Sequence, residues 1–152
     1  MDGYRDEIRK IMISVNALEG IYTQAAKKVG VKENTLAFLY ALDDGKNHSQ
    51  KKICQEWMIP KTTLNTIVKE CVEAGYVILE PEGHTKEKEI RLTEEGKNYT
   101  RKVLNQIYEV EKRAFESTLR EYSAEFPQAI SRFSSHLYEE AKKYFGEHQS
   151  EG

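Results

Sequence analysis

The sequence has few cysteines and no long apolar run, and each shortage narrows the classes of protein to consider. Its 152 residues include only two cysteines, which excludes the disulfide framework of a small secreted protein. No uninterrupted apolar stretch is long enough for a signal peptide or a membrane span, so we expect a cytoplasmic protein with no membrane partner. With 39% hydrophobic and 32% charged residues, the composition fits a single globular domain over residues 1–152.

The motifs of common enzymes and metal sites are also missing. The sequence has no glycine-rich phosphate loop, no Ser/His/Asp arrangement in plausible elements and no pair of carboxylates isolated on an apolar face. The histidines are far apart and lack the usual metal-ligand spacings; they are His48, His84, His136 and His148. We therefore expect no enzyme activity, no metal and no other cofactor.

An overall excess of positive charge is absent too. The net charge is −2 and the pI is about 6.1, so the chain lacks the bulk positive field of many nucleic-acid binders. Several lysines nevertheless gather between residues 46 and 88: Lys46, Lys51, Lys52, Lys61, Lys69, Lys86 and Lys88. Binding to a polyanion would therefore be local and would depend on orientation.

What the chain does contain is the pattern of a helix-turn-helix. Ser49 is suited to cap a first helix, Pro60 to begin a second, and Gly75 to end the second after residue 74. Apolar side chains recur at positions that face a shared interior: Ile53, Trp57, Ile59, Leu64 and Ile67. Cys54 and Cys71 occupy inward positions as well, which predicts core thiols whose pKa is raised.

Two predicted strands follow the second helix. Residues 76–79 have the composition of a strand, and residues 89–92 alternate between apolar and polar. Residues 81–87 between them are polar and rich in turn formers, as expected of a hairpin loop. Helix, turn, helix and hairpin in this order make a winged helix, which we assign to residues 34–96.

Amphipathic helices flank this unit, in residues 4–30 and 97–146. The first has apolar residues at three- and four-residue spacing from Ile8 to its expected end at Gly30. The apolar faces fit either an intramolecular core or an interface between two copies of the chain. The predicted fold class is mainly α with a small β-hairpin wing, a winged helix-turn-helix flanked by long dimerisation helices.

Capping residues and a proline predict the remaining helix boundaries. A short helix is predicted over residues 36–42. Thr93 is suited to cap the helix that follows the hairpin, which we expect to end near Arg120. Ser123 is predicted to start the last helix, with Pro127 in its early turns.

Four segments of the chain resemble the MarR family of bacterial transcriptional regulators: residues 49–54, 62–68, 73–77 and 92–96. The flanking helices match the family's layout, so the resemblance covers nearly the whole chain. It implies a homodimer held by the first and last helices. It also implies a pair of recognition helices that read the half-sites of a pseudo-palindromic operator in double-stranded DNA.

Three positions differ from the family's pattern. Lys86 stands where the family usually has a wing arginine that enters the minor groove. Met58 stands where the helix-turn-helix turn often has a left-handed glycine, a geometry that would cost about 1 kcal/mol for methionine. Thr66 stands where an arginine is common, so the family's base contacts do not carry over directly.

The predicted DNA contacts come mainly from the outward face of the second helix: Lys61, Thr62, Thr63, Asn65, Thr66 and Lys69. Asn65 has the chemistry for bidentate adenine recognition, while Lys61 and Lys69 suit phosphate or guanine. Ser49 and Gln50 lie at a helix N-terminus that suits phosphate, although Ser49 is equally suited to capping alone. Lys86 and Lys88 complete the set from the hairpin. The alternative is that all of these side chains simply form a solvated face.

We therefore expect a sequence-specific DNA-binding transcriptional regulator that acts as a homodimer, with a ligand-responsive repressor favoured. The resemblance also implies a small aromatic or anionic effector in a crevice near Tyr22, Phe38, Tyr40 and Tyr108, although aromatic residues at helical spacing are more often core. The alternatives are a winged helix used as a protein-interaction module, or a metal or redox sensor on the same scaffold.

Overall fold

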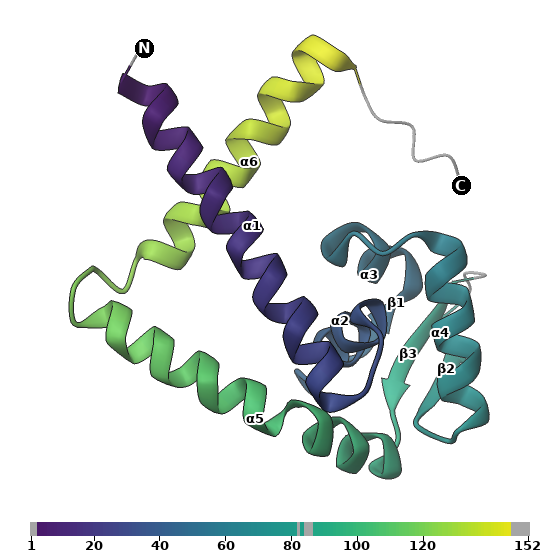
Figure 1. The fold of residues 1–152 in the computed structure, drawn as a ribbon. Coiled ribbons are helices and arrows are strands. Elements are labelled where there is room, and N and C mark those ends of the chain that lie inside the picture. The colour runs from purple at the N-terminus through teal and green to yellow at the C-terminus, as the bar shows by residue number, and fades with distance from the viewer. Residues whose placement is uncertain (1–2, 82, 84–86, 147–152) are drawn as a thin grey trace. The chain divides into compact units, whose positions relative to one another are not determined.

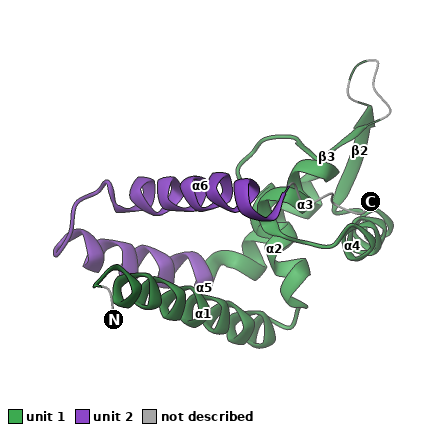
Figure 2. Cartoon of the chain, turned by 90° about the horizontal axis from the view of Figure 1, so that it is seen from above, with its two compact units in different colours: residues 1–105 green, residues 106–152 purple. Residues whose placement is uncertain are grey.

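The computed structural model describes residues 3–81, 83 and 87–146, and it is mainly helical (Figure 1). Its elements in chain order are α1 (Gly3–Val29), α2 (Glu33–Leu42), β1 (His48–Ser49), α3 (Gln50–Trp57), α4 (Lys61–Glu73), β2 (Val77–Pro81), β3 (Lys88–Leu92), α5 (Glu94–Leu119) and α6 (Phe126–Phe145). The chain divides into two compact units, residues 1–105 and 106–152, and α5 runs from the first into the second (Figure 2). None of the described helices is both long enough and apolar enough to cross a membrane.

The core of the first unit lies among α2, α3, α4, the sheet and the first turns of α5. Its most deeply buried apolar side chains are Phe38, Leu39, Leu42, Ile53, Leu64, Val77, Ile90 and Leu104. A fully buried aliphatic or aromatic side chain of this size contributes about 1.5–3 kcal/mol. This shared interior confirms the predicted winged helix. It also assigns Phe38 to the core, since that side chain has no exposed surface.

The predicted helix-capping serine and threonine are both confirmed. Ser49 is the N-cap of α3, where its Oγ accepts a hydrogen bond from the Lys52 backbone N–H at 3.2 Å. Thr93 Oγ1 accepts from the Gly96 N–H at 2.9 Å and donates to the Gly75 carbonyl at 2.6 Å. The second bond ties the start of α5 to Gly75, which follows the C-cap residue of α4.

The last helix begins three residues later than predicted, at Phe126 rather than Ser123. Ser123 Oγ accepts from the Glu125 N–H at 3.1 Å, a local bond between residues two apart. Bonds of this kind stabilise a turn instead of a helical start. Pro127 lies in the first turn of α6, as predicted.

The sheet has three antiparallel strands in the order β1-β3-β2. Ile90 in the central strand pairs with His48 on one side and with Leu79 on the other. The hairpin was predicted, with strand ends that the structure shifts by one or two residues. The two-residue β1 was not predicted, because a segment this short has no periodicity to detect.

A close backbone contact fixes α5 against the base of the hairpin. A Cβ atom on Gly96 would lie 1.8 Å from the Tyr76 carbonyl oxygen, so only glycine fits at this position. The Tyr76 carbonyl also accepts from the Thr93 N–H at 3.0 Å. The rings of Tyr76 and Tyr99 stack with their centroids 4.2 Å apart, which adds an aromatic contact to the same junction.

Trp57 departs from its predicted inward position. Its side chain keeps 37% exposure, and its ring lies against Tyr40 with the centroids 5.3 Å apart. Trp57 is the last residue of α3, where the chain turns away, whereas Ile59 after the turn is buried. The indole therefore covers the edge of the core instead of filling it.

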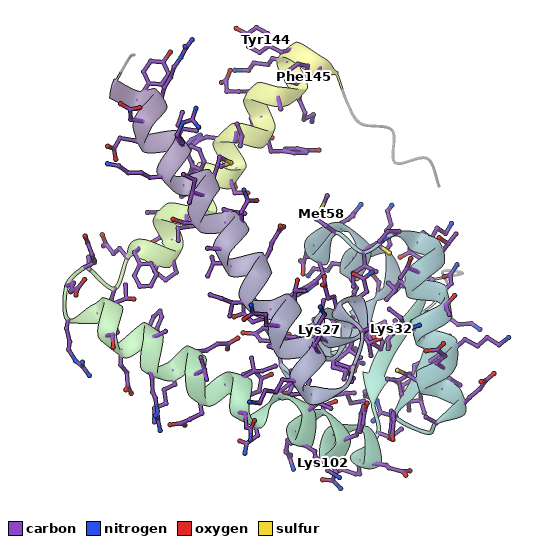
Figure 3. All side chains as sticks on the ribbon, in the orientation of Figure 1. Lys27, Lys32, Met58, Lys102, Tyr144 and Phe145 are labelled. Atoms are coloured by element: carbon purple, nitrogen blue, oxygen red, sulfur yellow. The ribbon has the colours of Figure 1, made fainter. Side chains whose placement is uncertain are left out.

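Met58 has a left-handed backbone conformation at the turn where the family that the sequence resembles often has glycine. Its backbone has φ 51° and ψ 41°, and its side chain is 84% exposed at the α3–α4 turn (Figure 3). A left-handed residue with a Cβ is strained by about 1–2 kcal/mol. Little side-chain burial offsets that strain here.

We expect Met58→Gly to raise the free energy of unfolding by about 0.5–1 kcal/mol, because the relieved strain exceeds the entropy that glycine adds to the unfolded chain. Met58→Ala is the matched control: it removes the same long side chain but keeps the Cβ, so it should give no gain. Urea denaturation followed by circular dichroism measures both. Equal stabilisation by glycine and alanine would show that the side chain, and not the backbone, is responsible.

Candidate nucleic-acid interface

Helix α4 has one buried face and one solvent face, as predicted. The inward residues are at most 6% exposed: Leu64, Ile67, Val68 and Cys71. On the outward face Thr62, Asn65, Thr66 and Lys69 are exposed, and Thr63 is half-buried at the boundary. The helix lies beside the β2–β3 hairpin (Figure 1). Its solvent face therefore carries polar side chains on a helix whose orientation is fixed by the core.

The start of α3 contributes a polar side chain to the same surface. Gln50, the first residue of α3, donates from Nε2 to Oδ1 of Asn65 on α4. The two residues lie on different helices, 15 positions apart in the sequence. Both residues belong to the site predicted from the sequence, but the bond between them was not predicted.

Three lysines of the candidate site are exposed: Lys61, Lys69 and Lys88. Within the part of the chain that the structure describes, none of them forms an ion pair with a carboxylate. Their charges are therefore available to an external anion. Lys86, the remaining lysine predicted to contact DNA, lies outside the described residues.

The loop before α3 is held by a polar cluster that the sequence analysis missed. His48 Nε2 lies 2.8 Å from Asp44 Oδ1, which also accepts from the Lys46 N–H at 2.9 Å. Slight burial acts to raise the pKa of Asp44, but these two hydrogen bonds and the nearby positive charges lower it overall. Asn47 donates to Glu89 of β3 at 3.1 Å. The cluster fixes the chain where it enters α3.

A recess of about 280 Å³ lies in the first unit, away from the solvent face of α4. It is lined by Leu42, Asp43, Gly45, Lys46, Arg91, Leu92, Lys97 and Arg101. Two of its cations are partly neutralised, because Arg91 pairs with Glu80 at 2.7 Å and Lys97 pairs with Glu94 at 2.8 Å. The lining therefore carries four cations, Lys46, Arg91, Lys97 and Arg101, and one carboxylate, that of Asp43.

Residues 29–86, which include α2, α3 and α4, match the family model described as "MarR family". Over this part of its length the chain is similar to the MarR family. No curated protein matches the sequence.

Solved structures, among them two MarR family regulators, share the fold at low identity. NMB1585 from Neisseria meningitidis superposes with a TM-score of 0.76 at 17% identity, covering 90% of this chain and 97% of that chain. A putative MarR family regulator from Listeria monocytogenes, solved with a 26mer DNA, gives 0.62 at 16% identity and covers 90% and 89%. NadR, solved with 4-hydroxyphenylacetate, gives 0.66 at 14% and covers 84% and 89%. At this level of identity the likeness establishes the fold.

The two thiols of the chain have raised pKa values, as predicted. Burial raises the pKa of Cys71 to about 11, with a further contribution from Glu70. Burial also raises the pKa of Cys54, against the opposing charge of Lys61. Cys54 is only half-buried, less than its predicted core position implies. Among the described residues, no group of three or more His, Cys, Asp or Glu side chains is placed to hold a metal ion.

We expect both thiols to resist alkylation by iodoacetamide at pH 8. With a pKa of about 11, roughly one Cys71 in a thousand is a thiolate at that pH, against about a quarter of free cysteine. Cys71 should therefore react at least about 100-fold more slowly than free cysteine, and Cys54 at an intermediate rate. Mass spectrometry of the alkylated chain measures both rates, with urea-unfolded protein as the control. A Cys71 rate equal to that of free cysteine would revive the redox-sensor alternative.

Proposed function

We propose that the chain is a homodimeric, sequence-specific DNA-binding transcriptional regulator that inserts α4 into the major groove. The observation that carries the proposal is the division of α4 between a buried apolar face and an exposed polar face. A helix that is held by the core and presents hydroxyl, carboxamide and ammonium groups has the chemistry to read base edges. The structural relative solved with a 26mer DNA supports the same use of the fold.

In this proposal the side chains divide between base contacts and phosphate contacts. Asn65 is assigned to adenine, and the hydroxyls of Thr62, Thr63 and Thr66 to neighbouring base edges. Lys61, Lys69 and Lys88 are assigned mainly to phosphates. Ser49 Oγ is already engaged in capping, so its contribution is the backbone N–H at the start of α3. Lys86 is assigned to phosphate, because an ammonium lacks the planar fork that suits a narrow minor groove.

We expect Asn65→Ala to weaken binding to the preferred operator by about 1–3 kcal/mol while leaving binding to random DNA almost unchanged. Lys61→Ala is the matched comparison and should weaken both, because a phosphate contact carries no sequence information. Fluorescence anisotropy at several salt concentrations, on operators selected by the wild-type protein, measures these affinities.

Two outcomes would contradict the proposal in different ways. Equal losses on selected and random DNA would remove Asn65 from the base-reading residues. A wild-type protein that selects no DNA sequence, and whose weak binding vanishes at physiological salt, would instead favour a protein-interaction module.

The dimer is proposed from the apolar faces of the terminal helices. Of α1 only Ala26 is buried, and the described residues of α6 include none that is buried. Large apolar side chains on both helices are 37–83% exposed, among them Ile8, Leu18, Ile130, Leu137, Tyr144 and Phe145, the last two at the C-terminal end of α6 (Figure 3). An apolar surface of this extent is costly in water, and a second copy of the chain would cover it.

We expect the double variant Ile130→Glu with Leu137→Glu to be monomeric, because these two positions share one face of α6 and carboxylates there would oppose burial. Ser135→Glu adds a charge to the same helix about 140° away from Ile130, so this control should remain dimeric. Sedimentation velocity measures the oligomeric state, and anisotropy measures operator binding. An intact dimer of the double variant with unchanged operator affinity would exclude this face of α6 from the interface.

Response to an effector is the second part of the proposal, with repression in the absence of ligand. The basic recess lined by Lys46, Arg91, Lys97 and Arg101 supports a small anion as the effector class. The relative solved with 4-hydroxyphenylacetate, an aromatic carboxylate, supports the same class. Of the aromatic residues proposed for an effector crevice, Phe38 is fully buried and does not line one.

A further inference from the structure

The bond between Gln50 and Asn65 is the one described side-chain hydrogen bond that joins α3 to the solvent face of α4. We propose that Gln50 is a positioning residue that fixes the carboxamide of Asn65, so that specificity at one operator base pair depends on the two residues together. This inference rests on the DNA-binding function proposed above. It assigns Gln50 a role different from the phosphate contact expected at a helix N-terminus.

The chemistry of a carboxamide explains why it needs a positioning partner. Its oxygen accepts and its nitrogen donates, yet the two ends have nearly the same shape, so rotation by 180° exchanges donor and acceptor. Adenine presents an acceptor, N7, beside a donor, the N6 amino group. Only one of the two orientations of the carboxamide gives two hydrogen bonds to this edge of adenine. In water the carboxamide of an exposed asparagine samples both orientations.

The observed bond couples the orientation of the Asn65 carboxamide to that of Gln50. Gln50 Nε2 donates to the oxygen of Asn65, so rotation of Asn65 alone would place two donors against each other and is disfavoured. Asn65 Oδ1 retains a second lone pair, and Nδ2 has no hydrogen-bond acceptor among the described residues. One acceptor site and one donor site therefore remain for a base. Fixing them before binding lowers the side-chain entropy lost in the complex.

Both ends of the bond are anchored by the fold. Gln50 follows the Ser49 cap, and Ser49 pairs with Glu89 in the sheet. Asn65 follows Leu64, which has no exposed surface. The backbone on each side is therefore held by the core. A phosphate contact alone would not require Gln50 to reach across to α4.

The test compares base preferences of the full-length protein across a panel of operators. Wild-type protein first selects its preferred operator, and every position of it is then replaced by each other base. Affinity ratios are measured for wild type, Gln50→Ala, Asn65→Ala and the double variant. Gln55→Ala is the control, since Gln55 is an exposed residue of the same helix. Ratios between operators cancel any sequence-independent change in affinity.

We expect Gln50→Ala and Asn65→Ala to lose preference at the same base pair, by about fivefold or more. The double variant should lose no more than Asn65→Ala alone, because the two residues act as one unit. Gln55→Ala should keep the wild-type profile. If Gln50→Ala weakens all operators equally and keeps every preference, Gln50 contacts phosphate only and the inference is wrong.

Two further variants at position 50 test the orientation of the Asn65 carboxamide directly. Lysine at position 50 only donates, so Gln50→Lys should keep the preference for adenine. Glutamate only accepts, so Gln50→Glu should turn Asn65 around, place its nitrogen against the N6 donor of adenine and lower the preference for adenine. Unchanged preferences in Gln50→Glu would overturn the inference. A wild-type protein that selects no sequence would instead overturn the proposed function, so the two failures are distinguishable.

Discussion

The burial of one face of α4 is the constraint on which the rest of the structure depends. Leu64, Ile67 and Val68 fix the rotation of the helix about its own axis, because each would otherwise expose apolar surface at a cost of about 1.5–3 kcal/mol. That rotation determines which residues face the solvent. The positions of Asn65 and Lys69 on the outer face therefore follow from the packing of the core. A substitution in the core would therefore change the orientation of the outer-face residues without replacing any of them.

Much of this architecture could be predicted, because the capping residues and the spacing of apolar residues indicate the same helices. Ser49, Pro60, Gly75 and Thr93 mark helix boundaries through backbone hydrogen bonds or fixed dihedral angles, which neighbouring residues alone determine. The division of α4 into two faces follows from the spacing of its apolar residues in the same way. The start of α6 was misplaced because Ser123 forms a turn that resembles a cap in sequence.

The features that could not be predicted depend on contacts between distant segments. β1 exists because His48 and Ser49 meet β3, and Gly96 is required because the Tyr76 carbonyl lies where its Cβ would be. Gln50 and Asn65 were each placed in the site from helix geometry, but their mutual bond depends on how α3 crosses α4. Met58 was identified as a departure from the family, and only the structure reveals that the left-handed turn is kept.

The charge of the chain explains why one winged helix would be a weak DNA-binding module. With a net charge of −2, long-range attraction to DNA is small, so affinity depends on a few lysines and on short-range contacts from α4. Two linked copies overcome this weakness, because binding of one recognition helix raises the effective concentration of the second at its half-site. In our proposal the exposed apolar faces of α1 and α6 supply that linkage. Selective binding then needs both surfaces. The apolar faces of α1 and α6 link the two copies, and the polar face of α4 contacts the bases.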